Sequence, residues 1–177
     1  PIDRLPEILS VNYPPEIVIR DCIKNKISFR VTAYDPDGDS LSYIWRARYG
    51  NIESFGETAR YLPPEIIPQG GEDQIFISVT DGIYTVTDTA NIRIKIAQEM
   101  VDRAQRLYNE AQSLYREGNA LLKDFGRTSE AEEKWNRAKE KWKEVMEILK
   151  CDTLSQVYRE AKDALDRLDR IYPHERM

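Results

Sequence analysis

The sequence predicts an antiparallel β-sandwich over residues 1–97, followed by an antiparallel three-helix bundle over residues 98–177. Three observations predict this division. Eight of the nine prolines lie in the first part. β-Branched and aromatic residues alternate with polar residues there, as they do in strands, whereas Ala, Leu, Glu, Lys and Arg dominate the second part, as they do in helices. The change of composition near residue 97 therefore indicates a boundary between a β domain and an α domain.

Runs in which apolar and polar residues alternate predict strands that bury one face. Turn-forming residues separate these runs at 35–39 and at 81–82, where Gly supplies a positive φ and Asp bonds its own backbone. About seven short strands joined by turns within about a hundred residues indicate an antiparallel sandwich. The clearest runs lie at residues 27–33, 41–47, 75–79 and 90–96.

The order of these motifs resembles a known family. The Asp-Pro-Asp-Gly-Asp turn at 35–39 leads into a strand that contains Trp45, and the Asp-Gly turn at 81–82 precedes a closing Ile-x-Ile-x-Ile strand. Over residues 7–97 this order resembles the immunoglobulin-like PKD family. The resemblance implies an Ig-like sandwich in an extracellular or periplasmic protein, in a module that spaces, presents or adheres rather than catalyses. Arg-Ala-Arg-Tyr at 46–49 stands where the family commonly has Phe-Gly-Asp-Gly, so the subgroup stays open.

Three amphipathic helices are predicted in the second part, because apolar residues recur there at alternating spacings of three and four. A capping pair begins each of the last two helices, and a glycine or a proline ends the first and the third. Short loops make neighbouring helices antiparallel, so we expect an up-down-up bundle. The capping pairs are Ser129 with Glu132 and Thr153 with Gln156, and the stops are Gly126 and Pro173.

The second helix also has a faint resemblance to tetratricopeptide repeats, carried by Ala131, Trp135 and Ala138 with Ala111 and Gly118 upstream. The first helix is too long for a repeat of about 34 residues, and the chain contains no second copy. The resemblance therefore predicts no helical binding surface.

Several enzyme classes are excluded by residue type. The single histidine, His174, lies three residues from the end, so neither a Ser-His-Asp or Cys-His pair nor a histidine-based metal cage is expected. The sequence contains no phosphate-binding Gly-Lys-Ser/Thr loop and no Gly-x-Gly-x-x-Gly turn. No run approaches the roughly 18 to 20 apolar residues of a membrane span. We therefore expect a non-enzymatic chain with no organic cofactor, and its start at Pro1 predicts a piece of a longer protein.

The acidic turn is the main candidate for chemistry. Asp35, Asp37 and Asp39 lie within one turn, and the fold can bring Asp81 close to them. Clustered carboxylates and turn carbonyls are the ligands that a hard cation such as calcium takes. A solvated turn, selected for its backbone geometry, explains the same residues and is the favoured interpretation. A calcium site at these four aspartates remains the alternative.

Two aromatic side chains in the second helix allow two interpretations. Trp135 and Trp142 are seven residues apart and so share the buried face of the helix, which predicts core packing rather than an exposed stacking platform. Glutamates interleave with the lysines around them, and the net charge of the chain is −5. We therefore expect no nucleic-acid binding.

Two cysteines, Cys22 and Cys151, fall in different predicted domains. We expect two free thiols, with a bridge that staples the domains of an exported protein as the alternative. Arginines and aromatic residues near the predicted strand with Trp45 provide a weak signal for a partner site. They are Arg46, Arg48, Tyr49, Phe55, Arg60 and Tyr61.

These observations predict an extracytoplasmic segment of a larger cell-surface or envelope protein. Its expected role is interaction, spacing or scaffolding, with a protein or cell-surface partner and without nucleic acid. The alternatives are a calcium-dependent or carbohydrate- or protein-binding module, or an accessory module of an extracellular hydrolase.

Overall fold

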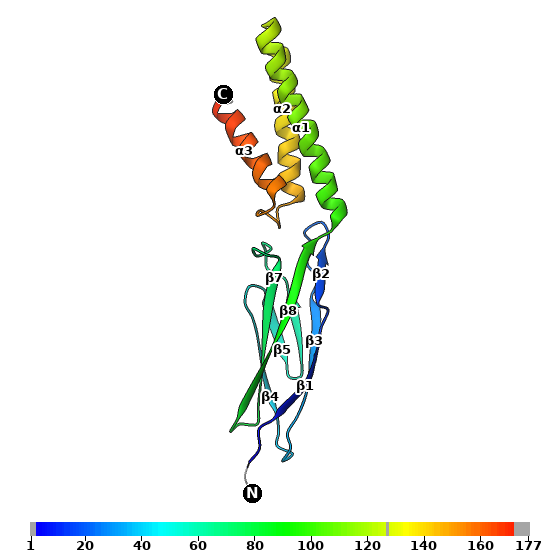
Figure 1. Cartoon of the computed structure of the whole chain (residues 1–177), viewed down its shortest axis with the longest axis vertical. Helices are drawn as coiled ribbons and strands as arrows, with labels where there is room; N and C mark the ends of the chain where they lie inside the picture. The colour runs from blue at the N-terminus through cyan, green and yellow to red at the C-terminus, as the bar shows by residue number, and fades with distance from the viewer. Residues whose placement is uncertain (1–2, 127, 172–177) are drawn as a thin grey trace. The chain divides into compact units, whose positions relative to one another are not determined.

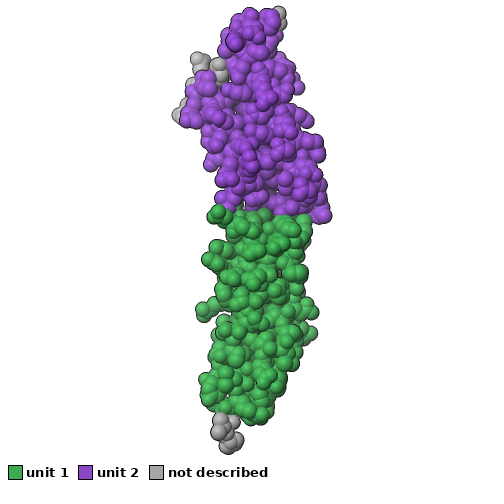
Figure 2. Space-filling model, in the orientation of Figure 1, with its two compact units in different colours: residues 1–19, 23–95 green, residues 20–22, 96–177 purple. Residues whose placement is uncertain are grey.

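The computed structural model describes residues 3–126 and 128–171. The chain divides into two compact units (Figure 2). The sandwich unit comprises Pro1–Ile19 and Ile23–Lys95, and the helical unit comprises Arg20–Cys22 and Ile96–Met177. Arg20–Cys22 therefore belongs to the helical unit, although it lies between two strands of the sandwich in the sequence.

The sandwich unit consists of two four-stranded sheets (Figure 1). One sheet has the order β1-β3-β6-β5 and the other has the order β2-β8-β7-β4. The pairs β1–β3, β3–β6, β5–β6, β4–β7 and β7–β8 are antiparallel. This is the division of strands between the two sheets of an immunoglobulin fold, and it confirms the predicted Ig-like sandwich. The strands are β1 (Glu7–Asn12), β2 (Glu16–Ile19), β3 (Ile27–Tyr34), β4 (Ser42–Ala47), β5 (Asn51–Phe55), β6 (Thr58–Leu62), β7 (Glu72–Thr80) and β8 (Thr85–Ile96).

The core between the sheets follows from the alternation of residues along the strands. In β7 every second side chain from Asp73 to Val79 is buried, and the intervening side chains are not. Phe29 contacts Trp45 and Tyr61 edge-on, with ring centroids 6.3 and 5.9 Å apart. The indole N–H of Trp45 donates to the backbone oxygen of Gly56 at 2.9 Å. The aromatic core is thus apolar with its polar atoms satisfied.

One buried carboxylate interrupts this core. Asp73 is 1% exposed and accepts four hydrogen bonds. Three come from the backbone N–H groups of Tyr49, Gly50 and Gln74, and the fourth comes from the hydroxyl of Tyr61 at 2.7 Å. Burial, followed by the bond to Asp73 and its charge, raises the pKa of Tyr61 above the ordinary tyrosine value. Four donors compensate the cost of burying this charge.

The helical unit contains α1 (Gln98–Phe125), α2 (Thr128–Ile148) and α3 (Gln156–Ile171). The first two helices run antiparallel. The ion pairs between them show this direction, since residues that come later in α1 pair with residues that come earlier in α2. These pairs are Arg103–Glu144, Glu110–Lys141 and Glu117–Lys134. The third helix packs mainly against α2 and barely against α1 (Figure 1). None of the three helices is long and apolar enough to cross a membrane.

Trp135 and Trp142 are 3% and 1% exposed, which confirms their predicted place in the core of the helices. Gly118 lets α1 approach α2 closely at Trp135. A Cβ at position 118 would stand 2.8 Å from the Cδ1 atom of Trp135 and 3.1 Å from the carbonyl oxygen of Ala131. The absence of a side chain at this position is therefore part of the packing.

Helix ends agree only partly with the sequence. Gly126 ends α1 with a left-handed φ of 64°, as a C-terminal glycine commonly does. α2 begins at Thr128, so Ser129 lies inside its first turn rather than before it. The third helix is capped by Ser155, whose hydroxyl accepts from the backbone N–H of Tyr158 at 3.3 Å, and not by Thr153. Pro173 and His174 lie outside the described residues.

Candidate metal centre

The turn after β3 is held by one oxygen of Asp35. Its Oδ1 accepts from the backbone N–H of Asp37 at 2.7 Å and from that of Asp39 at 3.1 Å. Gly38 adopts a φ of 85°, which closes the turn. The second oxygen, Oδ2 of Asp35, is buried and has no hydrogen-bond partner. One carboxylate oxygen of Asp35 therefore holds the turn, and the other oxygen is left without a hydrogen-bond donor.

Asp81 repeats this arrangement in the turn between β7 and β8. Its Oδ1 accepts from the backbone N–H groups of Ile83 at 2.7 Å and Tyr84 at 2.6 Å. Its Oδ2 is buried and has no partner. Two turns that are distant in the sequence thus each present one free carboxylate oxygen.

A third free oxygen comes from Asp3, which the sequence did not predict. Its Oδ2 is also buried without a partner. Desolvation raises the pKa of Asp3, and the charges of Asp81, Asp39, Asp37 and Asp35 raise it further. Asp3 therefore lies within electrostatic range of all four predicted aspartates, and the five carboxylates form one acidic end of the sandwich unit.

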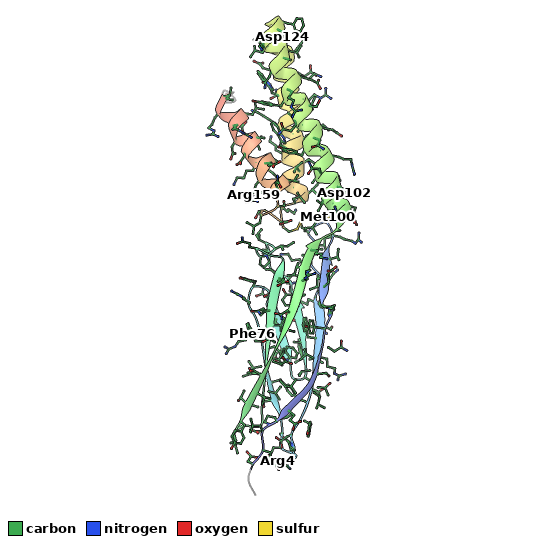
Figure 3. All side chains as sticks on the ribbon, viewed as in Figure 1. Arg4, Phe76, Met100, Asp102, Asp124 and Arg159 are labelled. Carbon is green, nitrogen blue, oxygen red and sulfur yellow. A yellow bond between two sulfur atoms is a disulfide. The ribbon has the colours of Figure 1, made fainter. Side chains whose placement is uncertain are left out.

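Asp37 accepts hydrogen bonds from Arg4, which Figure 3 labels at this end of the sandwich unit. The Arg4 side chain donates to Oδ1 of Asp37 from Nε at 2.9 Å and from Nη2 at 2.7 Å. The backbone N–H of Arg4 donates to Oδ2 at 2.7 Å. These bonds lower the pKa of Asp37. Both of its oxygens are thus engaged, which leaves Asp37 less available to a cation than Asp35 or Asp81.

The acidic end of the sandwich unit offers carboxylate oxygens, which are the ligands of hard cations. Calcium takes six to eight oxygen ligands at about 2.3 to 2.6 Å, and Asp3, Asp35 and Asp81 can each supply one carboxylate oxygen. Asp39 is exposed and can add a fourth. Across residues 3–126 and 128–171 no three acidic, histidine or cysteine side chains stand ready as a metal cage. An ion would therefore have to draw these carboxylates together and complete its shell with water.

The two cysteines are joined, which corrects the prediction of free thiols. Cys22 and Cys151 form a disulfide with their Cα atoms 5.7 Å apart. Asp21 and Cys22 adopt positive φ values of 51° and 52°. The backbone N–H of Asp21 donates to the sulfur of Met100 at 2.9 Å. The prediction was wrong because Arg20–Cys22 belongs to the helical unit, so the bridge lies within that unit.

The predicted arginine and aromatic patch does not form one surface. The guanidinium of Arg48 lies over the ring of Tyr49 at 5.2 Å, and that of Arg60 lies over Phe55 at 5.3 Å. Tyr61 is fully buried. Arg46 lies on β4, beside Phe76 of β7 in the same sheet, whereas Phe55 and Arg60 lie on β5 and β6 of the other sheet. These residues thus form separate stacked pairs and core contacts.

No family model and no curated protein matches this sequence. Human protocadherin-24 EC1-2 is similar at 15% identity over 52% of this chain and 44% of that chain, with a TM-score of 0.38. An endo-fucoidan hydrolase from glycoside hydrolase family 107 is similar at 19% identity over 51% of this chain and 14% of that chain, with a TM-score of 0.37. The Ig1-2 module of the Drosophila receptor protein tyrosine phosphatase DLAR is similar at 13% identity over 53% and 50%, with a TM-score of 0.33.

The chain therefore spans half or less of the length of each of these three structures. At such identities and TM-scores the similarities assign no function.

Proposed function

We propose that this chain is a non-enzymatic, extracytoplasmic segment that spaces or presents a protein-binding surface within a larger cell-surface or envelope protein. The disulfide between Cys22 and Cys151 carries this proposal. Structural disulfides persist in secreted, periplasmic and cell-surface proteins, and reducing agents keep them rare in the cytosol. The oxidised pair therefore supports an oxidising compartment.

The two-sheet sandwich supports the role of a module. Its turn motifs resemble the PKD family, whose members mostly space, present or adhere, and that finer assignment remains a prediction. The non-enzymatic part of the proposal rests on the sequence, where the single histidine lies at position 174. In a sandwich the loops gather at the two ends, where they can form a binding surface without catalytic residues.

Labelling of intact cells of the source organism tests the compartment. A membrane-impermeant amine reagent should modify exposed lysines such as Lys26 and Lys95 before the cytoplasmic membrane is broken. A cytosolic enzyme in the same cells is the control and should stay unlabelled. Labelling of this chain only after complete lysis would contradict the proposal.

Calcium binding at the acidic end is a second candidate function. The observation that favours it is the set of three buried, unpaired oxygens on Asp3, Asp35 and Asp81. The five carboxylates outnumber the one arginine, Arg4, that pairs with them, so they repel one another, and a divalent cation reduces that repulsion. With an open shell the affinity should be weak, so the melting temperature should respond only to calcium well above the dissociation constant.

Asparagine substitutions test this candidate sharply. In Asp35→Asn and Asp81→Asn the amide oxygen can still accept the bonds that hold the turn, while the free carboxylate oxygen is lost. Calorimetric titration should detect calcium binding in the original chain, and each variant and Asp3→Asn should weaken it. Asp88→Asn changes an exposed aspartate on β8 and is the matched control. Equal binding in all four variants, or no binding at millimolar calcium, would reject the site.

A further inference from the structure

A groove on the helical unit runs between α1 and α3. It has a volume of about 520 Å³ and exists because α3 packs on α2 and barely touches α1. The apolar part of its lining comes from Tyr115, Trp142, Ala164 and Ile171, and the polar part comes from Gln112, Arg167 and Arg170. All of these residues belong to the helical unit.

The indole of Trp142 leaves a polar group unsatisfied in this lining. Trp142 is 1% exposed and packs against Tyr115 with ring centroids 5.9 Å apart. Its indole N–H is buried and has no hydrogen-bond acceptor within the described part of the chain. Buried donors are almost always paired in folded proteins, so the unpaired N–H of a side chain that lines the groove favours an acceptor supplied from outside.

The two arginines of the groove are held but not neutralised. The Nε–H of Arg167 donates to the carbonyl of Asp163, and that of Arg170 donates to the carbonyl of Asp166, both at 3.2 Å. Within residues 3–126 and 128–171 neither guanidinium forms an ion pair. These backbone bonds fix each side chain and leave its terminal N–H groups for a ligand.

The charged residues of the groove lining are both basic, Arg167 and Arg170. Among residues 3–126 and 128–171, no carboxylate lines it. Of the nearby acidic residues, Asp169 pairs with Lys139 at 2.6 Å and Glu110 pairs with Lys141 at 2.5 Å. Asp163 and Asp166 lie one helical turn before the two arginines and do not line the groove. The lining therefore offers two arginines to an anionic acceptor, beside an indole whose buried N–H has no partner in the described part of the chain.

We propose that this groove binds an acidic peptide segment of a partner protein, with a carboxylate held by Arg167 and Arg170 and a neighbouring apolar side chain against Trp142 and Tyr115. This rests on the proposed function, because it names the partner surface of that module. Arginine forks match carboxylates in bidentate geometry. The exposed positions of both arginines and of Ile171 leave the groove open along the helices, which suits a chain segment better than an enclosed small molecule.

Selection from a display library of random seven-residue peptides tests the proposal on the full chain. We expect peptides with Asp or Glu beside Leu, Phe or Tyr, and we expect the Asn/Gln version of the best peptide to bind about tenfold more weakly or worse. The double variant Arg167→Gln/Arg170→Gln should lose binding to the same extent. Arg159→Gln, on the same helix but outside the groove, is the matched control and should bind normally.

A second readout follows the indole. The N–H resonance of Trp142, assigned by its loss in Trp142→Phe, should shift when the acidic peptide is added. Selection without enrichment of acidic residues, unchanged affinity in the double variant, or an unmoved Trp142 resonance would each overturn the proposal. If cell labelling still places the chain outside the cytoplasm, only the groove assignment falls and the module assignment stands.

Discussion

The hydroxyl of Tyr61 donates a hydrogen bond of 2.7 Å to the carboxylate of Asp73 in the interior of the sandwich unit. Tyr61 belongs to β6 and Asp73 belongs to β7, so the bond joins the two sheets. The same carboxylate accepts from the backbone N–H groups of Tyr49 and Gly50, which fixes the turn between β4 and β5. A single buried charge thus holds both sheets and one turn.

Tyr61→Phe should lower the free energy of unfolding of the sandwich unit by about 1.5 to 3 kcal/mol, because it removes one donor from a buried charge. Urea denaturation followed by tryptophan fluorescence and by circular dichroism measures this loss. Tyr49→Phe is the matched control, because Tyr49 is half-exposed and its backbone, not its ring, bonds Asp73. Equal stabilities of the two variants would show that the hydroxyl bond contributes nothing.

The raised pKa of Tyr61 predicts a loss of stability in alkali. Its folded pKa lies above the unfolded value of about 10, so the folded state keeps the hydroxyl proton where the unfolded state releases it. The associated stability is complete below about pH 10 and falls as the pH rises toward the folded pKa. Unfolding free energies measured from pH 8 to 11 should stay level to about pH 10 and then decline, and those of Tyr61→Phe should decline less steeply. Parallel curves for the two proteins would contradict this assignment.

Gly118→Ala should destabilise the helical unit by about 1 to 3 kcal/mol, since the new Cβ would crowd Trp135 and the carbonyl of Ala131. This cost opposes the gain of about 1 kcal/mol that Ala brings to a helix interior. Ser113→Ala, at an exposed position of the same helix, is the control and should be neutral or slightly stabilising. Thermal unfolding that is unchanged or raised in Gly118→Ala would show that α1 and α2 are not packed so closely there.

The disulfide should stabilise the helical unit. Its cysteines are 129 residues apart, and the chain-entropy model assigns about 5 kcal/mol to a loop of this length. Cys22→Ser/Cys151→Ser should therefore unfold at lower denaturant, by about 2 to 5 kcal/mol. The original chain with a reductant should behave like this double variant, and the double variant should not respond to the reductant. An equal free energy of unfolding in all three samples would show that the disulfide does not stabilise the helical unit.

Sequence patterns were enough to predict the elements that bury one face. The alternation in β7 and the three-and-four spacing in α1 and α2 report burial directly, so the sandwich and the helices could be predicted. The same alternation places Asp73 among the buried positions of β7, and this was a usable sign of a buried carboxylate that passed unnoticed.

The remaining features depend on contacts between distant parts of the chain. Nothing local marks Asp3 as a neighbour of the turns at Asp35 and Asp81, because that proximity exists only once the strands have paired. The pairing of Cys22 with Cys151 was missed for the same reason, since a segment within the β domain packs with the helices. Local periodicity carries no information on such contacts.

The most direct test of the proposed module is the redox state of its cysteines in the source cells. Cells are quenched in acid, free thiols are alkylated, and the chain is digested without a reductant and mapped by mass spectrometry. An extracytoplasmic chain should give an intact linked peptide that contains Cys22 and Cys151, with neither cysteine alkylated. Two alkylated cysteines and no linked peptide would place the chain in a reducing compartment and contradict the account.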